Sequence, residues 1–203
     1  MAIEKELKFV ITNAGVRETL VRLDAFGDFR MGPGKLVKVV DHYYDTTDGR
    51  VASNGFALRI RQDDERRTIC LKALGATRDA MHVREEIEQP HDADGLQPMD
   101  RGAVRDRLES MVAVSDLDEI VVIRQRRLKR DVSRGEGIIA EWSFDDVVFE
   151  VGDTRYDHTE LEIELVGTDD EAILEEIGRI LQDQFGLQPA FQSKYETALQ
   201  LRD

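Results

Sequence analysis

The sequence predicts an α+β fold in which eight strands form an antiparallel sheet or barrel and helices pack against it. Three observations support this. Apolar and charged residues alternate with a period of two along much of the chain, short turn-rich segments separate the alternating stretches, and a few other segments have the period of an amphipathic helix. Strands joined by short turns favour antiparallel pairing, because a parallel pair needs a long crossover connection.

The predicted strands cover residues 3–11, 37–44, 55–61, 66–72, 81–88, 120–130, 138–149 and 158–166. Turn-forming residues separate several of them, among them Gly32-Pro33-Gly34 and Thr47-Asp48-Gly49. Gly135-Glu136-Gly137 lies between two strongly alternating stretches and predicts a hairpin there.

Four segments predict helices. The first begins near Thr12 or Asn13, and the second covers about 100–111. The third follows Thr168-Asp169-Asp170-Glu171, which has the spacing of a capping box, and ends at Gly186. Ser193-Lys194-Tyr195-Glu196 repeats the capping-box spacing and predicts a short helix near the C-terminus.

Length and composition predict one soluble domain over residues 1–203. The single Cys70 excludes an intramolecular disulfide framework, and no Cys/His spacing resembles a zinc site. The chain has neither a signal-like apolar run near Met1 nor a stretch long enough to span a bilayer. We therefore expect a cytoplasmic protein with no membrane partner.

The formal net charge of −14 argues against a nucleic-acid polymer as partner, since an acidic surface repels DNA and RNA. Basic residues are nevertheless concentrated locally, at Arg59 and Arg61, at Arg66 and Arg67, and along 124–130. An anion bound by such clusters should be small enough to fit a local pocket.

Charged residues gather on one face of most predicted strands. Those faces carry Glu4, Glu6 and Lys8; Arg59 and Arg61; Lys72; Arg84, Glu86 and Glu88; Arg124 and Arg126; Glu141, Ser143 and Asp145; and Glu160, Glu162 and Glu164. A charged strand face ordinarily meets water. Here, however, acidic and basic residues are segregated by strand, and the helices need the apolar strand faces for packing. The charged faces are therefore expected to point into a hydrated barrel interior.

Such a lining has a specific chemistry. Carboxylates are the ligands that Mg²⁺ and Mn²⁺ prefer, and those ions also take phosphate oxygens. Arginine and lysine side chains hold phosphate through charge-assisted hydrogen bonds. The residues therefore predict a metal–polyphosphate site.

Glu4-Lys5-Glu6-Leu7-Lys8 has the pattern Glu-x-Glu-x-Lys, which resembles the opening of the CYTH domain, the core of the triphosphate tunnel metalloenzymes. The resemblance extends over nearly the whole chain. It continues in order through Tyr43-Tyr44-Asp45-Thr46, Leu58-Arg59-Ile60-Arg61, Cys70-Leu71-Lys72, Arg84 with Glu86, Arg124 with Arg126, Phe144-Asp145, Glu160 to Glu164, and Ser193-Lys194-Tyr195.

The resemblance implies an eight-stranded antiparallel tunnel with helices packed on the outside. The implied metal ligands are Glu4, Glu6, Asp145, Glu162 and Glu164. The implied triphosphate-binding residues are Lys8, Arg59, Arg61, Lys72, Arg84, Arg124, Arg126 and Lys194. The implied catalytic residues are Glu4, Glu6, Lys8, Glu162 and Glu164.

The activity that the resemblance implies is Mg²⁺- or Mn²⁺-dependent hydrolysis of a small triphosphate. Inorganic tripolyphosphate is preferred because the opening is similar to bacterial triphosphatases and because aromatic residues, at 6%, offer no evident base pocket. A class IV adenylate cyclase, a thiamine triphosphatase and a non-catalytic polyphosphate- or nucleotide-binding module remain alternatives. The residues leave open whether the chain forms a homodimer.

The roles of Glu86, Glu88, Glu141 and Glu160 are not determined by the pattern. We expect Arg127, Lys129 and Arg130 to form a solvated strand end, and Cys70 to line the interior without acting as a nucleophile. The four histidines, His42, His82, His91 and His158, are scattered, and structural or surface positions are expected for them.

Overall fold

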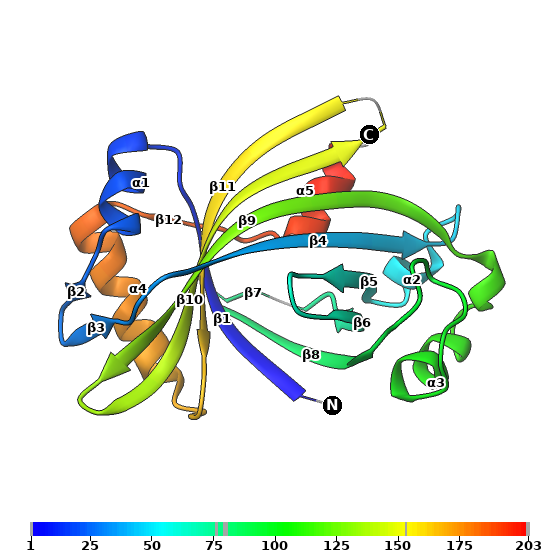
Figure 1. Ribbon diagram of the computed structural model, residues 1–203, viewed down its shortest axis with the longest axis horizontal. Helices are drawn as coiled ribbons and strands as arrows, with labels where there is room; N and C mark the ends of the chain where they lie inside the picture. Colours follow the sequence, from blue (N-terminus) through cyan, green and yellow to red (C-terminus); the bar gives the residue numbers. More distant parts are fainter. Residues whose placement is uncertain (1, 76, 79–80, 153, 202–203) are drawn as a thin grey trace.

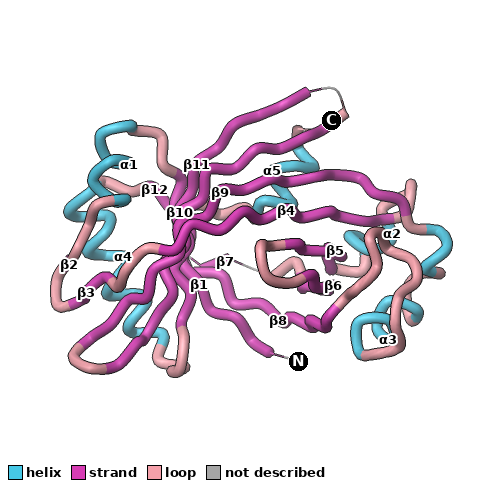
Figure 2. The backbone as a smooth tube through the Cα atoms, in the orientation of Figure 1, coloured by secondary structure: helices cyan, strands magenta, loops and turns pink. Residues whose placement is uncertain are grey.

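The computed structural model describes residues 2–75, 77–78, 81–152 and 154–201. Eight long strands pair in the order β10-β11-β1-β8-β6-β5-β4-β9, and β9 pairs with β10 to close the barrel (Figures 1 and 2). They are β1 (Ala2–Val10), β4 (Lys35–Asp45), β5 (Phe56–Gln62), β6 (Arg67–Ala73), β8 (Met81–Pro90), β9 (Asp118–Arg134), β10 (Gly137–Val151) and β11 (Thr154–Leu165). All these pairings are antiparallel, which confirms the predicted fold class.

Four short strands extend this barrel and were not predicted. They are β2 (Ala25–Phe26), β3 (Phe29–Met31), β7 (Thr77–Arg78) and β12 (Gln188–Pro189). Strands of two or three residues are too short to show a period-two pattern, so sequence periodicity cannot reveal them.

The described residues form five α-helices: α1 (Ala14–Val21), α2 (Arg50–Ser53), α3 (Ala103–Glu109), α4 (Glu171–Phe185) and α5 (Lys194–Gln200). A 3₁₀ turn, η1 (Val114–Asp116), precedes β9. Helix α2 was not predicted. It follows directly after Thr47-Asp48-Gly49, and the Asp45 carboxylate accepts hydrogen bonds from the Val51 and Ala52 amides at its start.

The helix ends are set by local side chains. Asn13 caps α1, and Ser193 with Glu196 forms the predicted capping box at the start of α5. At α4 the prediction was wrong in detail, because the N-cap is Asp170 and the Thr168 hydroxyl accepts a hydrogen bond from the Asp170 amide instead. Gly186 ends α4 at φ 66°, a left-handed conformation that favours glycine.

Helices α1 and α4 cover the outer, apolar faces of β1, β10 and β11. Leu20, Leu174, Ile177 and Leu181 from the helices pack there in one cluster with Leu7, Phe9, Trp142, Phe144, Leu161 and Ile163 from the strands. Helix α3 packs in a second cluster with Leu58, Ile60, Ile69 and Leu71 of β5 and β6. Each such buried side chain contributes about 1.5–3 kcal/mol relative to exposure. Because the apolar faces are used outside, the charged faces of these strands point inward.

Helix α5 packs differently from the others. Its Tyr195 and Ala198 contact side chains from the inward face of the barrel, including Val121 and Ile123 of β9. The Tyr195 ring stacks on Tyr43 of β4, with ring centroids 4.9 Å apart. The interior is therefore apolar where α5 packs and charged along the rest of its length, and α5 delivers Lys194 to the boundary between the two zones.

Candidate functional site

The barrel interior buries an unusual number of ionisable side chains. Lys8 and Arg84 are each 4% exposed, and Asp145 is 0% exposed. Cross-strand pairing sets opposite charges beside one another, with Lys8 opposite Glu162 and Lys72 opposite Glu86. Burying an unpaired charge is very costly, so this register is what makes a charged interior tolerable.

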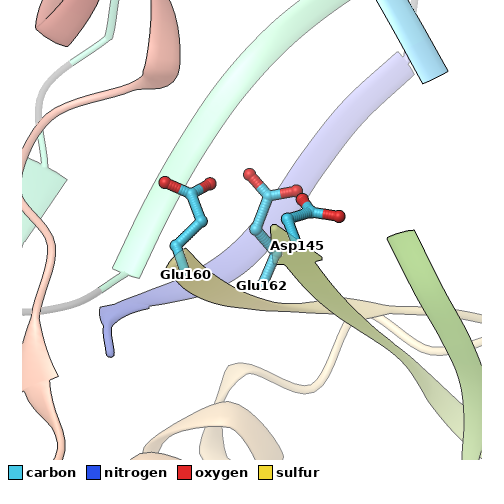
Figure 3. Close-up of side chains that lie close together, drawn as sticks. All are labelled: Asp145, Glu160 and Glu162. Carbon is cyan, nitrogen blue, oxygen red and sulfur yellow. The ribbon is translucent and has the colours of Figure 1, made fainter. Parts of the chain in front are cut away.

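Three carboxylates gather on the wall formed by β10 and β11. Asp145, Glu160 and Glu162 each place a carboxylate oxygen within 4.8 Å of the others (Figure 3). Three oxygen donors at this spacing fit a hard divalent cation such as Mg²⁺ or Mn²⁺. Asp145 and Glu162 were predicted as metal ligands, whereas the role of Glu160 was left open.

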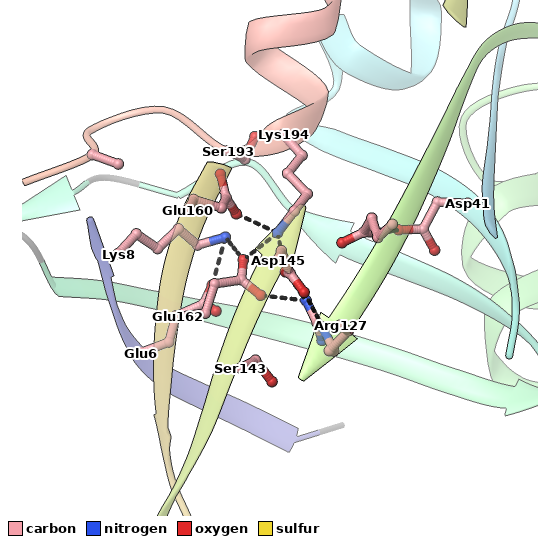
Figure 4. Close-up of polar contacts among 12 residues, drawn as sticks. Glu6, Lys8, Asp41, Arg127, Ser143, Asp145, Glu160, Glu162, Ser193 and Lys194 are labelled. Atoms are coloured by element: carbon pink, nitrogen blue, oxygen red, sulfur yellow. Dashed lines mark hydrogen bonds and ion pairs between the residues drawn. The ribbon is translucent and has the colours of Figure 1, made fainter. Parts of the chain in front are cut away.

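Lys194 lies among these three carboxylates. Its Nζ is 3.0 Å from Asp145 Oδ2 and 2.9 Å from Glu162 Oε1, and it also forms an ion pair with Glu160 (Figure 4). Lys8 Nζ approaches Glu162 Oε1 to 2.6 Å from the neighbouring strand. Burial opposes ionisation of Glu162, but Lys194, Lys8 and Arg127 together hold its pKa well below the ordinary value. The carboxylate is therefore charged and able to bind a cation.

Arg127 belongs to the same network. Its Nη2 donates to Asp145 Oδ2 and to Glu162 Oε2, both at 2.6 Å. The prediction that Arg127 forms a solvated strand end is therefore wrong.

Arg124 and Arg126, the predicted triphosphate ligands of this strand, lie on the opposite face and are exposed. Arg124 Nε instead donates to Glu150 at 3.0 Å outside the barrel. The expectation that Arg124 and Arg126 point into the barrel is therefore wrong, because their face of the strand alternates with the face that carries Val121 and Ile123. Those two apolar residues face inward, against α5. The face of the strand that enters the interior is thus the one carrying Gln125 and Arg127.

Basic residues dominate the wall formed by β5, β6 and β8. Arg59, Lys72 and Arg84 line a cavity of about 30 Å³, together with Tyr43, Ala57, Ala73, Leu74, Ser193 and Tyr195. Lys72 pairs with Glu4 and lies 3.4 Å from Glu86 Oε2, whereas Arg59 is held loosely, 3.7 Å from Glu86 and 3.9 Å from Asp41.

Arg84 is the least compensated of these cations. Within the described part of the chain, its guanidinium lies within 4 Å of no carboxylate, and the Nε atoms of Arg84 and Arg59 have no hydrogen-bond partner. A buried cation that lacks a counter-ion is strongly destabilising unless an anion is supplied. These spare donors fit phosphate oxygens.

Asp41 is a site residue that was not predicted. It is 0% exposed and accepts hydrogen bonds of 2.7 Å from Arg61 Nε, Arg61 Nη2 and Gln125 Nε2. Burial would raise the pKa of Asp41, but Arg61 and Arg59 lower it well below 3.8. The sequence did contain a signal, since Asp41 has the same period-two position, and so the same strand face, as the buried Val37, Val39 and Tyr43.

The remaining predicted metal ligands lie on two neighbouring strands, Glu4 and Glu6 on β1 and Glu164 on β11. Glu6 is 3.3 Å from Lys8 Nζ, and Lys8 and Lys72 lower the pKa of Glu6 to about 2 against the effect of burial. Burial, with Glu4 and Glu6 nearby, raises the pKa of Glu164 to about 7. Metal binding by Glu4, Glu6 and Glu164 stays a prediction.

The structure shows the contacts of several residues whose roles the sequence left undetermined. Glu86 accepts a hydrogen bond from the Cys70 thiol at 2.9 Å, and burial raises the pKa of Cys70, so the thiol remains protonated. Glu141 pairs with Lys129 at 2.8 Å, and Glu88 lies 3.8 Å from Arg66.

Arg130 is 9% exposed and donates to the backbone oxygens of Gly32 and Leu23, so its assignment to a solvated strand end is wrong. His82 is fully buried and contacts Arg84.

No helix among the described residues combines the length and the apolar character needed to cross a membrane.

Comparison with solved structures shows similarity over the whole fold. HpAC1 from Hippeastrum, an adenylyl cyclase candidate with a dominant triphosphatase activity, superposes with a TM-score of 0.71 at 18% identity, over 98% of this chain and 97% of its own.

Two further structures are similar in the same way. An adenylate cyclase candidate from Bacillus halodurans has a TM-score of 0.64 at 21% identity, covering 97% of this chain and 98% of its own. The PH1819 protein of Pyrococcus horikoshii has a TM-score of 0.64 at 22% identity, covering 98% of this chain and 99% of its own. The sequence model of the CYTH domain matches residues 2–194. The chain therefore belongs to the CYTH domain family, whose barrels are triphosphate tunnels.

Proposed function

We propose that this chain hydrolyses inorganic tripolyphosphate to pyrophosphate and phosphate, using Mg²⁺ or Mn²⁺. The observation that carries the proposal is the pairing of two features inside one closed barrel. A three-carboxylate cluster lies on one wall, and a cavity lined by Lys72 and by two arginines with unpaired Nε atoms, Arg59 and Arg84, lies on another. A metal-complexed polyanion would satisfy both.

The basic wall would bind the phosphate chain. Arg59 and Arg84 line the cavity there and have unused Nε donors, and guanidinium groups bind phosphate oxygens with fixed geometry. Lys72 adds a point charge on the same wall. Arg61 already donates to Asp41 through Nε and Nη2, so it acts in this proposal as support for the wall.

The acidic wall would hold the metal. Asp145, Glu160 and Glu162 supply only oxygen donors, and Arg127 and Lys194 lower the pKa values of Asp145 and Glu162 against the effect of burial. A divalent ion bound there would supply positive charge and lower the pKa of a water ligand. Lys8 and Lys194 would then be free to turn from the carboxylates toward the phosphate oxygens.

The reaction needs no covalent intermediate on the protein. A water oxygen bonds to the terminal phosphorus while the bridging phosphorus–oxygen bond breaks, and pyrophosphate leaves with the bonding electrons. Arg59, Lys72 and Arg84 would stabilise the charge that develops on the phosphate oxygens. The Cys70 thiol stays protonated and is not needed as a nucleophile.

The aromatic side chains that line the cavity on the basic wall support the inorganic substrate over a nucleotide or thiamine triphosphate. The two tyrosine rings of this cavity, Tyr43 and Tyr195, stack on each other and are buried. Neither ring is therefore available to stack against a base or a thiazolium ring.

A substrate panel tests the proposal. Tripolyphosphate, ATP and thiamine triphosphate are each incubated with Mg²⁺, Mn²⁺ or a chelator, and orthophosphate and cyclic AMP are measured. We expect orthophosphate from tripolyphosphate, the fastest of the three reactions, and none with chelator. Cyclic AMP from ATP would instead assign a cyclase, and binding of tripolyphosphate without consumption would assign a non-catalytic module.

A further inference from the structure

His82 lies two residues before Arg84 on β8, so both side chains point to the same inward face. The His82 side chain contacts both neighbours through its ring nitrogens. Its Nδ1 meets Arg84 Nη2, and its Nε2 lies 2.8 Å from the backbone oxygen of Ala190. The residue is 0% exposed.

These two partners fix where the imidazole carries its proton. A carbonyl oxygen only accepts hydrogen bonds, so Nε2 must donate to Ala190. A guanidinium only donates, so Nδ1 must offer its lone pair to Arg84. Burial lowers the pKa of His82, which favours this neutral form.

A neutral hydrogen-bond acceptor affects Arg84 differently from a carboxylate. Arg61 and Arg127 are each oriented by a carboxylate, which also cancels their charge. Arg84, within the described residues, has no carboxylate within 4 Å. An imidazole lone pair orients a guanidinium without neutralising it, so Arg84 keeps its full charge for an incoming anion.

The second contact ties His82 to the segment that leads into α5. The Ala190 amide donates to the backbone oxygen of Lys8 at 2.9 Å, which anchors this segment on β1. The Nε2 contact thus fixes the ring on a rigid support, and Nδ1 is left pointing at Arg84.

We propose that His82 is a positioning residue that holds the Arg84 guanidinium toward the cavity as a neutral acceptor, leaving its charge available to the triphosphate. The identity of the anion rests on the proposed function. The contact itself rests only on the geometry of His82, Arg84 and Ala190.

Two substitutions separate the two contacts. In His82→Asn the side-chain oxygen can take the place of Nδ1 and accept from Arg84, but it cannot reach Ala190. In His82→Gln the amide N–H can take the place of Nε2 and donate to Ala190, but the Arg84 contact is lost. His42→Gln, on the half-exposed outer face of β4, serves as the control.

We measure the affinity of each variant for tripolyphosphate calorimetrically in chelator, where no turnover occurs, together with KM and kcat in Mg²⁺ and the melting temperature. We expect His82→Gln to bind about tenfold more weakly with a raised KM, and His82→Asn and His42→Gln to stay within about threefold of the wild type. The reverse order, or equal loss in both His82 variants, would overturn the proposal.

A double-mutant cycle then tests whether His82 acts through Arg84. If it does, adding His82→Gln to Arg84→Ala costs no further affinity. An additive loss would show that His82 acts by another route and would overturn the positioning role.

Nitrogen-15 NMR of the imidazole tests the contact without any ligand. We expect a protonated Nε2 and an unprotonated Nδ1, and a shifted Arg84 Nε–H resonance in His82→Gln but not in His42→Gln. The opposite tautomer would contradict the proposal even if tripolyphosphate binds. Failure of the wild type to bind tripolyphosphate, with the tautomer as expected, would instead contradict the proposed function.

Discussion

The two walls of the barrel interior differ in how completely their cationic side chains are paired with carboxylates. On the wall of β10 and β11, three carboxylates are contacted by Lys194 of α5 and two by Arg127 of β9. On the wall of β5, β6 and β8, Arg59 stays 3.7 Å or more from its carboxylates. Arg84 is held there by the neutral His82. The carboxylates of the acidic wall are therefore already neutralised by side chains, whereas Arg59 and Arg84 of the basic wall lack close negative partners.

Because of this difference between the walls, binding of a divalent cation and binding of a phosphate chain should depend on each other. An anion completes the basic wall directly. A divalent cation can enter the acidic wall only if an ammonium group gives up its place, and a phosphate chain gives that group a new partner. Metal and triphosphate are therefore expected to bind more tightly together than separately.

The largest expected effect comes from removing one charge of the acidic wall. In Glu162→Gln, Lys8, Arg127 and Lys194 lose a shared carboxylate, and we expect turnover of tripolyphosphate to fall by about 10²–10³-fold. Steady-state orthophosphate release measures this.

The matched control for that variant is Glu150→Gln. Glu150 pairs with Arg124 on the outer face of the barrel, so its loss should leave turnover within about twofold, because exposed ion pairs contribute little. Wild-type turnover in Glu162→Gln would contradict the assignment of the acidic wall.

Asp41 is expected to dominate the stability of the basic wall. In Asp41→Asn, Arg61 and Arg59 lose their buried counter-charge, and we expect a loss of about 3 kcal/mol in the free energy of unfolding. Urea titration measures this loss.

The same residue predicts a pH dependence with a definite sign. Because Arg61 and Arg59 depress the folded pKa of Asp41 below its ordinary 3.8 against the effect of burial, its stabilising contribution is complete above about pH 4 and is lost as pH falls toward the folded pKa. Stability of the wild type should therefore fall more steeply below pH 4 than that of Asp41→Asn. If the stability of the wild type and that of Asp41→Asn fall equally as the pH is lowered, protonation of Asp41 does not contribute to acid unfolding.

A smaller effect is expected on KM, and it distinguishes an arginine inside the barrel from one on its outer surface. Arg59→Ala should raise the KM for tripolyphosphate by about 10–100-fold, the equivalent of one or two charged hydrogen bonds. Arg124→Ala, which removes an outer-face arginine of similar chemistry, should leave KM unchanged. An effect of Arg124→Ala equal to that of Arg59→Ala would place the substrate outside the barrel.

The smallest effect concerns the competition between Lys194 and the metal. Lys194→Met removes the ammonium that contacts Asp145, Glu160 and Glu162, so Mn²⁺ alone should bind about tenfold more tightly. Calorimetric titration of Mn²⁺ without phosphate measures this. Weaker Mn²⁺ binding would mean that Lys194 supports the metal site and does not compete for it.

The sequence pattern predicted most of the interior because most strands alternate cleanly. In β1 and β11, Glu4-x-Glu6-x-Lys8 and Glu160-x-Glu162-x-Glu164 alternate with Leu, Ile and Phe, so the charged face is unambiguous. The helices that cover the apolar faces could be placed from the same pattern and from their capping residues.

Strand β9 could not be predicted in the same way. Residues 124–130 are nearly all charged or polar, so alternation there does not reveal which residues face inward. The only guides were Val121 and Ile123, and these face the interior because α5 fills that end of the barrel. Asp41 was missed for a related reason, since its inward neighbours Val37, Val39 and Tyr43 are apolar. The error at β9 comes from a tertiary contact that no local pattern contains.

The most direct test is a crystal structure with Mn²⁺ and tripolyphosphate, collected at a wavelength where manganese scatters anomalously. We expect an anomalous peak bound by Asp145, Glu160 and Glu162, with phosphate density against Arg59 and Arg84. Phosphate density beside Arg124 and Arg126 on the outer face, or a barrel interior that excludes both ions, would contradict the account.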